Sequence, residues 1–354
     1  MTRLKNNTHR KLFIFCFFML GYSVQAQIHI RGQVVDSTTN SPILGVSVYF
    51  DGTTIGTVTD KKGNFDLRLK EKISSPLVIG VLGYKSKKLG ALGLEKNNVD
   101  LKTIALGPKV ESLKEVVLEP DTWSRERKLK YFIPGFLGKI HEGCFIKNIN
   151  KVYLRFSKKE KKLTAYAKEP LQIENKALGF KIRFSLSNFE MNFKFYPAVN
   201  GRPKPKFTPY SIFFTGTTFF EEISDDPSKY KAVRKRAYLG SSVHFMRALK
   251  NKTLEENDFA IFRKSFIRGP YKFFGFKDTK DSTQTKIEIT TDELSILYDG
   301  EKQTGLKTIT DPCVILIDQF GNHYPPNALM FTGDMGERRA ASLLPLDYRL
   351  AEED

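Results

Sequence analysis

The stretch FKIRFSLSNFEMNFKF, residues 180–195, alternates between apolar and polar side chains along most of its length. Alternation with a period of two is typical of a β-strand that has one buried and one solvent-facing side. The apolar positions change parity at Asn188, which indicates a bulge or a tight turn that redirects the strand. We therefore expect a long strand here, in an antiparallel sheet with one wetted, basic face. Further strand candidates lie at residues 152–156, 163–167, 212–220, 260–262, 286–289, 294–298 and 313–317.

One amphipathic helix is predicted among these strands, over residues 228–250. Residues 225–228, Asp-Asp-Pro-Ser, form a typical helix N-terminal signal, and apolar residues then recur at helical spacing. His244 lies on the apolar stripe, so we expect it to be buried and hydrogen-bonded. A catalytic role for His244 is disfavoured because no partner motif accompanies it.

Cationic side chains crowd this helix and form a predicted basic patch. The patch could bind an anionic ligand, or it could be a solvated helix face, because charge runs usually serve solubility. The candidate ligand-binding residues are Lys231, Arg234, Lys235, Arg236 and Arg247.

Residues 27–107 contain short strand patterns separated by turn signals, as in a small β-sandwich. Asp51-Gly52 is a hairpin signal, and residues 76–82 form an apolar run that fits a central strand. Residues 60–65, Asp-Lys-Lys-Gly-Asn-Phe, predict a turn in which Gly63 takes positive φ. A calcium loop is disfavoured there, because Lys62 occupies an alternate ligand position.

Several glycine-anchored turns give this segment a family resemblance. The motifs are Gly32-x-Val34-Val35-Asp36, Gly45-Val46-x-Val48, Gly56-x-x-Thr59-Asp60-x-x-Gly63-Asn64-Phe65 and Gly83-Tyr84-Lys85. They resemble the carboxypeptidase-regulatory-like domain of exported Gram-negative proteins, which implies a transthyretin-like sandwich of seven strands. The expected fold class is thus mainly β: this sandwich, followed by a β-rich α+β region with one prominent amphipathic helix.

The resemblance implies no peptidase activity, because in metallocarboxypeptidases this domain is an appendage to a zinc-dependent catalytic domain. The zinc motif of that catalytic domain is missing: none of His29, His141, His244 and His323 is followed by a glutamate three residues later. His141 and Cys144 are three positions apart but lack a second ligand pair. We expect no metal and no cofactor.

Residues 1–26 are predicted to be a signal peptide. Four basic residues precede an apolar run at 12–22, and Val24-Gln25-Ala26 offers small residues for cleavage. We therefore expect an exported protein, in the periplasm or associated with the outer membrane. An oxidising compartment would permit a Cys144–Cys313 disulfide, but two buried free thiols are the preferred expectation.

The predicted domains are the signal peptide (1–26), the sandwich (27–107), a linker (108–130) and a β-rich domain of unknown function (131–354). Within the linker, residues 113–118 resemble the Leu-x-Glu-Val-Val-Val segment that follows the same sandwich in TonB-dependent receptors. A last strand plus linker is the preferred interpretation, because short motifs give many false matches. Residues 234–249 and 333–348 also resemble exported proteins of unknown function.

The formal net charge of +18 is unevenly distributed. Residues 121–280 carry 34 basic and 15 acidic side chains, net +19, whereas residues 281–354 carry 6 and 14, net −8. We expect the acidic segment to neutralise part of the basic excess. Lipopolysaccharide phosphates or an acidic polysaccharide would suit the remainder, and export disfavours nucleic acid as a partner.

The leading hypothesis is a non-enzymatic cell-envelope protein that binds a protein partner or an anionic glycan through its C-terminal region. Peripheral association with the outer membrane is compatible with it, and the oligomeric state is left open. The alternative is a small outer-membrane β-barrel or an accessory factor of a TonB-dependent uptake system; the predicted helix disfavours the barrel. For an uncharacterised hydrolase, the acidic residues are too scattered to nominate a catalytic pair.

Overall fold

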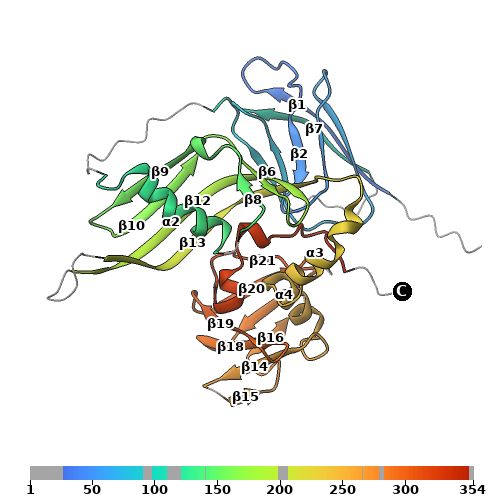
Figure 1. Cartoon of the computed structure of the whole chain (residues 1–354). Coiled ribbons are helices and arrows are strands. Elements are labelled where there is room, and N and C mark those ends of the chain that lie inside the picture. The colour runs from blue at the N-terminus through green and yellow to red at the C-terminus, as the bar shows by residue number, and fades with distance from the viewer. Residues whose placement is uncertain are drawn as a thin grey trace, which may run out of the picture.

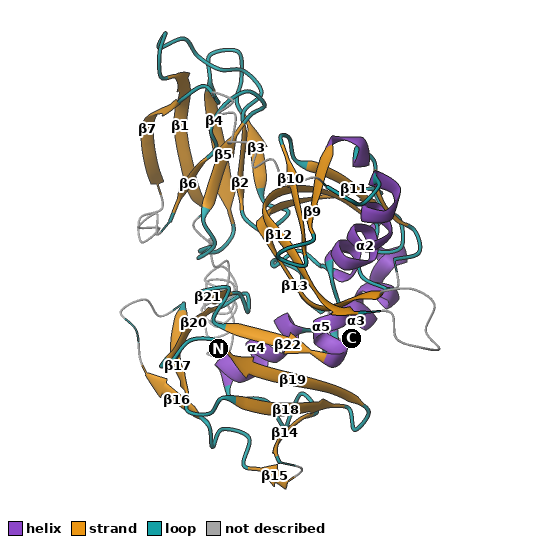
Figure 2. Ribbon diagram, turned by 90° about the vertical axis from the view of Figure 1, so that its left-hand side faces the viewer, coloured by secondary structure: helices purple, strands orange, loops and turns teal. Residues whose placement is uncertain are grey.

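The computed structural model describes residues 27–90, 98–109, 121–139, 141–197, 206–264, 266–277, 279 and 283–350. Strands dominate these residues, so the predicted fold class is confirmed (Figures 1 and 2). The predicted signal peptide and the receptor-like segment 113–118 lie outside the described residues. None of the described helices is long and apolar enough to cross a membrane.

The N-terminal part is a sandwich of two sheets, ordered β4-β1-β7 and β3-β2-β5-β6, which together give the seven predicted strands. Its core lies between the sheets, where Ile30, Val48 and Phe50 have no exposed surface. Gly63 has φ +74° at the predicted turn. The strands are β1 Ile28–Asp36, β2 Ser47–Phe50, β3 Gly56–Val58, β4 Asn64–Leu69, β5 Leu77–Gly80, β6 Lys87–Leu89 and β7 Asn98–Leu106.

A six-stranded antiparallel sheet follows, ordered β8-β11-β12-β10-β9 with β13 on the other side of β12. Leu186 pairs with Gly216 and Asn188 with Thr215, so one extra residue in β12 forms the predicted bulge. The strands are β8 Cys144–Ile146, β9 Val152–Ser157, β10 Lys162–Ala167, β11 Leu171–Asn175, β12 Phe180–Tyr196 and β13 Lys206–Glu222.

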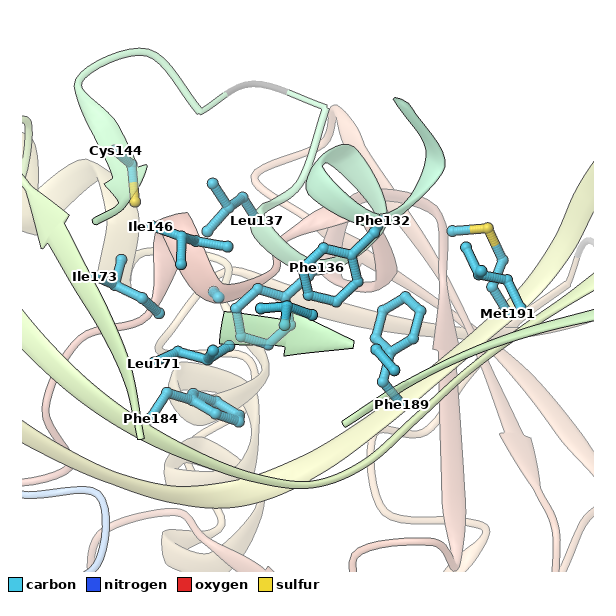
Figure 3. Close-up of a cluster of buried hydrophobic side chains, with 14 of the residues drawn as sticks. Phe132, Phe136, Leu137, Cys144, Ile146, Leu171, Ile173, Phe184, Phe189 and Met191 are labelled. Atoms are coloured by element: carbon cyan, nitrogen blue, oxygen red, sulfur yellow. The ribbon is translucent and has the colours of Figure 1, made fainter. Parts of the chain in front are cut away.

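Helix α2, Arg125–Leu137, covers the apolar face of this sheet. Phe132 and Phe136 pack edge-on against Phe189 and Phe184 of β12 (Figure 3). The predicted linker 108–130 is therefore wrong at its C-terminal end, where Ser124 accepts a hydrogen bond from the Arg127 amide and begins the helix.

The remaining residues form a second core, between a sheet ordered β15-β14-β18-β19-β22 and a sheet ordered β16-β17-β20-β21. The expected single domain over 131–354 thus contains two hydrophobic cores. The strands are β14 Phe259–Arg263, β15 Phe266–Arg268, β16 Phe274–Lys277, β17 Gln284–Ile289, β18 Glu293–Tyr298, β19 Lys302–Thr308, β20 Cys313–Asp318, β21 His323–Tyr324 and β22 Leu329–Thr332.

The predicted helix 228–250 is broken in two, which corrects the expectation of one continuous helix. Gly240 adopts φ +69°, and the Ser241 hydroxyl caps the second helix by accepting from the His244 amide at 3.1 Å. The helical segments are a 3₁₀ turn η2 Pro227–Tyr230, α3 Lys231–Tyr238 and α4 Ser242–Asn251, with η1 Ile149–Lys151, α5 Gly333–Glu337 and η3 Ala340–Ser342 elsewhere.

One loop of the sandwich, residues 51–55, is hydrogen-bonded to β13 and to the segment around Leu346. The Gly52 amide donates to Thr218 of β13 at 2.8 Å, and the Phe220 amide donates to Thr53 at 3.0 Å. From the C-terminal side, the Leu346 amide donates to Gly52 at 2.7 Å. The sandwich is therefore fixed to the rest of the chain by main-chain hydrogen bonds.

Candidate functional site

A pocket of 320 Å³ lies between the sandwich and the six-stranded sheet. One wall comes from β2, β5 and residues 81–86, and the other from residues 167–170 and β12. The volume falls in the range of small-molecule sites, which occur preferentially where two domains meet. This pocket, the interdomain pocket, is the candidate site.

Arg183 of β12 crosses the boundary between the two walls. Its Nη1 donates to the Ser47 hydroxyl of β2 at 2.8 Å, and its Nη2 donates to Glu221 at 3.2 Å. The guanidinium lies 4.8 Å from the centre of the Phe219 ring. Its Nε is buried and has no hydrogen-bond partner among the described residues. Arg183 thus holds the walls together and places a guanidinium at the pocket, paired on one side with Glu221.

Two lysines add to this charge. The Lys109 ammonium, just beyond the sandwich, donates to the Lys168 carbonyl at 3.0 Å and so bridges the two walls. The Lys168 ammonium lies 5.8 Å from the centre of the Tyr153 ring. Among the residues lining the pocket, Glu169 is the one carboxylate. The lining is therefore cationic overall.

Hydroxyl and apolar groups complete the lining. The Tyr49 hydroxyl lies 3.3 Å from the Thr217 hydroxyl, and burial raises the pKa of Tyr49. Leu82 is 70% exposed and contributes an apolar surface at the edge of the pocket. Cations, hydroxyls and an apolar surface in one concavity can bind a small polar anion that also has an apolar face.

The residues of the predicted basic patch do not form one surface. Lys231, Lys235 and Arg236 are exposed on α3, whereas Arg234 is buried. Arg247 of α4 is partly buried and donates to the carbonyls of Phe320, Leu346 and Tyr348. A ligand-binding role for the five stays a prediction.

Ion pairs join the basic and acidic segments of the chain, as expected from their charges. Lys277 pairs with Glu288 at 2.7 Å and Arg263 with Asp292 at 3.7 Å. Lys139 pairs with Glu337. Part of the basic excess is therefore neutralised within the protein.

The remaining sequence candidates have structural roles. His244 is buried as predicted: its Nδ1 accepts from the Gly240 amide at 3.1 Å, and its Nε2 lies 2.9 Å from Asn257 Oδ1. Burial lowers the pKa of His244. Cys144 and Cys313 are buried free thiols, which confirms that prediction.

The Asp60 turn is a hairpin, as predicted, because the Asp60 carboxylate accepts the amides of Lys62 and Asn64 at 2.8 Å. No group of three His, Cys, Asp or Glu side chains in the described ranges is arranged to hold a metal ion.

The family of the sandwich follows from its match. Residues 30–118 match the family model described as the CarboxypepD_reg-like domain. The sandwich is a carboxypeptidase-regulatory-like domain. Such a domain is itself non-catalytic. In this chain the regulatory-like domain supplies β2, β5 and residues 81–86 to the interdomain pocket.

Two further similarities were found. Over 63 residues the chain is 40% identical to the TonB-dependent receptor SusC of Bacteroides thetaiotaomicron, a stretch that covers 18% of this chain and 6% of the receptor. The chain therefore matches a small fraction of the receptor's length. The structure of a 9R-lipoxygenase from Cyanothece PCC8801 aligns at 13% identity over 65% of this chain and 48% of the lipoxygenase chain. The TM-score of this alignment is 0.20, which is too low to indicate a shared fold.

The sequence does not nominate Arg183 or Lys109 as site residues. Arg183 stands among the polar positions of the alternating strand, which is a signal for the wetted face and not for a pocket. Its partner Ser47 lies 136 positions earlier in the chain. The site therefore depends on how the regulatory-like domain docks, which local patterns do not report.

Proposed function

We propose that the protein is a non-enzymatic, exported cell-envelope protein that binds an anionic glycan in the interdomain pocket. The observation that carries the proposal is the convergence of Lys109, Lys168 and Arg183 on one concavity whose lining includes a single carboxylate. Cations attract the carboxylate or sulfate of an acidic sugar, and Arg can bind a carboxylate through two parallel hydrogen bonds.

The rest of the lining suits a sugar ring. Ser47, Tyr49 and Ser185 offer hydroxyl groups that can exchange hydrogen bonds with sugar hydroxyls. Val81 and Leu82 offer an apolar surface for the C–H face of the ring. This proposal moves the predicted anion site from α3 to the interdomain pocket, with one wall still in the C-terminal region.

The envelope location rests on two observations. Residues 1–26 carry the sequence pattern of a signal peptide. The similarity to a TonB-dependent receptor also supports a place in the cell envelope.

Calorimetric titration with oligogalacturonate, and with a neutral oligosaccharide of the same length as control, tests the glycan site. Arg183→Gln and Lys109→Gln should each weaken oligogalacturonate binding by about tenfold or more, because each removes a charge-assisted hydrogen bond. Lys181→Gln is the matched control: Lys181 is exposed on the same strand and does not line the pocket. Equal binding by all three variants, or no binding by the unmodified protein, would contradict the proposal.

A second candidate is an accessory factor of a TonB-dependent uptake system. The 40% identity to the receptor SusC over 63 residues favours it, because the matched stretch is a shared domain type. Affinity capture of the full-length protein from detergent-solubilised envelope should then recover a TonB-dependent receptor in near-stoichiometric amount. If the captured protein is recovered without a TonB-dependent receptor, the result would argue against this candidate.

A further inference from the structure

The end of β12 and β13 that lies away from the interdomain pocket carries exposed aromatic side chains. Phe195 is 37% exposed, Tyr196 44% and Tyr210 61%. Tyr196 and Phe195 are adjacent in an extended strand, so they point to opposite faces of the ribbon. Phe195 lies on the face of the core, 4.9 Å from Phe207 between ring centres. The aromatic surface therefore surrounds the end of the ribbon and does not line one side of it.

This end of the ribbon is also basic. Residues 192–197 and 206–213 contain two lysines, Lys194 and Lys206, and no acidic residue. The Lys194 ammonium lies 5.7 Å from the centre of the Tyr210 ring, which places cation and aromatic side by side.

The turn between β9 and β10 lies beside it, because the Phe193 amide donates to the Lys161 carbonyl at 2.8 Å. That turn, residues 158–161, has three lysines and one glutamate. Both hairpin ends point to the same side of the molecule, at the left of Figure 1.

Tyrosine and phenylalanine with interleaved lysines are the side chains that partition into the headgroup region of a bilayer. The aromatic rings enter the interface, while lysine stems extend so that their ammonium groups meet anionic headgroups. A sugar-binding platform presents its rings on one flat face. Rings on both faces of a projecting end fit a surface that closes around that end, as the headgroup layer does.

We propose that the hairpin end formed by Lys194, Phe195, Tyr196, Lys206 and Tyr210 docks the protein onto an anionic lipid bilayer surface. The binding is peripheral and reversible, since a few aromatic rings and lysines give a modest partition free energy. Arg183 of the interdomain pocket lies near the opposite end of β12, so the pocket could hold a ligand while the hairpin end is docked on a bilayer. Docking on a bilayer would not require a glycan in the interdomain pocket.

Vesicle flotation with the full-length mature protein tests this docking surface. The protein should float with phosphatidylethanolamine–phosphatidylglycerol vesicles, far less with phosphatidylcholine vesicles, and less as the salt concentration rises. The double variants Lys194→Gln/Lys206→Gln and Tyr196→Ser/Tyr210→Ser should each lower the partition coefficient by about tenfold or more. Glycan titration on the same variants should be unchanged, which separates the two proposals.

Tyr153→Ser/Tyr166→Ser is the matched control. These two tyrosines are exposed and stacked on the other end of β9 and β10, with 4.8 Å between ring centres. The control should float like the unmodified protein. The near-ultraviolet circular dichroism of Trp123, the single tryptophan, reports folding of every variant, because its ring stacks 3.7 Å from Phe156 behind the hairpin end.

Three results would overturn the proposal. The unmodified protein would fail to float with anionic vesicles, or the hairpin-end variants would float as well as the control. In the third, the protein would bind heparin through the same residues and not bind the vesicles, and the surface would then be a polysaccharide site.

Discussion

Arg234 and Glu222 form a two-point ion pair, with Nη1 2.8 Å from Oε1 and Nη2 2.6 Å from Oε2. The guanidinium also lies 3.9 Å from the centre of the Phe180 ring, and its Nε donates to the Leu178 carbonyl at 2.8 Å. Arg234 therefore ties α3 to the end of β13 and the start of β12, and its buried charge is fully engaged.

Arg234→Met should destabilise the protein by about 3 kcal/mol, because it leaves the Glu222 carboxylate and the Leu178 carbonyl without their donor. Urea unfolding measures this change. Arg236→Met is the control, since Arg236 is exposed two positions further along the same helix, and it should change stability by less than about 0.5 kcal/mol. Equal effects of the two substitutions would assign Arg234 to a solvated surface.

We expect Asp51 to contribute more to the stability of the folded protein in mild acid than at neutral pH. Burial raises the pKa of Asp51 to about 6, although the Thr218 amide donates to it at 2.8 Å. The pKa of Asp51 is 3.8 in the unfolded state and about 6 in the folded state, so between these pH values the folded state binds more protons than the unfolded state. The contribution of Asp51 to stability therefore falls as pH rises through this window.

Asp51→Asn removes this titration and leaves an oxygen that can accept from Thr218. The stability of the unmodified protein relative to the variant should increase by on the order of 1 kcal/mol between about pH 7 and pH 5. Urea midpoints measured for both proteins across that range check it. A constant difference would mean that Asp51 titrates in the same way in both states.

Gly63→Ala and Gly45→Ala separate backbone strain from steric contact. Both glycines have φ +74°. An added Cβ at Gly63 would lie 2.4 Å from the Val34 carbonyl oxygen, whereas an added Cβ at Gly45 would have no atom within 4 Å apart from its chain neighbours. Gly45→Ala should cost about 1 kcal/mol for the positive φ, and Gly63→Ala at least about 2 kcal/mol more. Thermal unfolding midpoints give the comparison, and similar losses at both positions would rule out the close approach.

Arg247→Met should weaken the attachment of residues 346–348 to α4. Its guanidinium donates to the Leu346 carbonyl at 2.7 Å, the Tyr348 carbonyl at 3.0 Å and the Phe320 carbonyl at 3.0 Å. Loss of these bonds should lower stability by about 2 kcal/mol and speed proteolytic removal of the last residues. Lys231→Met, an exposed change on α3, should leave the cleavage rate unchanged. Equal cleavage rates would contradict the role of Arg247.

Local patterns predicted the strands well, because parity is a property of neighbouring residues. The change of parity at Asn188 corresponds to the bulge in β12, and the Asp60–Phe65 turn forms as expected. Helix α2 is not predicted, because Pro134 and Gly135 interrupt it and charged residues crowd its first half. Phe132 and Phe136 stabilise it by packing on β12, which is a tertiary effect.

The sequence predicts neither the helix break nor the candidate site. The apolar stripe continues through Leu239, so periodicity alone does not reveal that Gly240 turns the chain. Arg234 and Arg247 belong to a charge run in the sequence, yet both face carbonyls contributed by distant segments. Charge composition predicts how many cations there are, and not which of them point inward.

The contact between Thr54 and Asp347, where the Asp347 carboxylate accepts the Thr54 amide at 2.9 Å, spans 293 positions. The sandwich can pack its own core through contacts within residues 28–106, but its 51–55 loop gains its partners Leu346 and Asp347 through contacts of very long sequence separation, which are slow to form. Shortened chains would leave Gly52 and Thr54 without them. The docking of the sandwich on the rest of the chain therefore depends in part on residues 346–347.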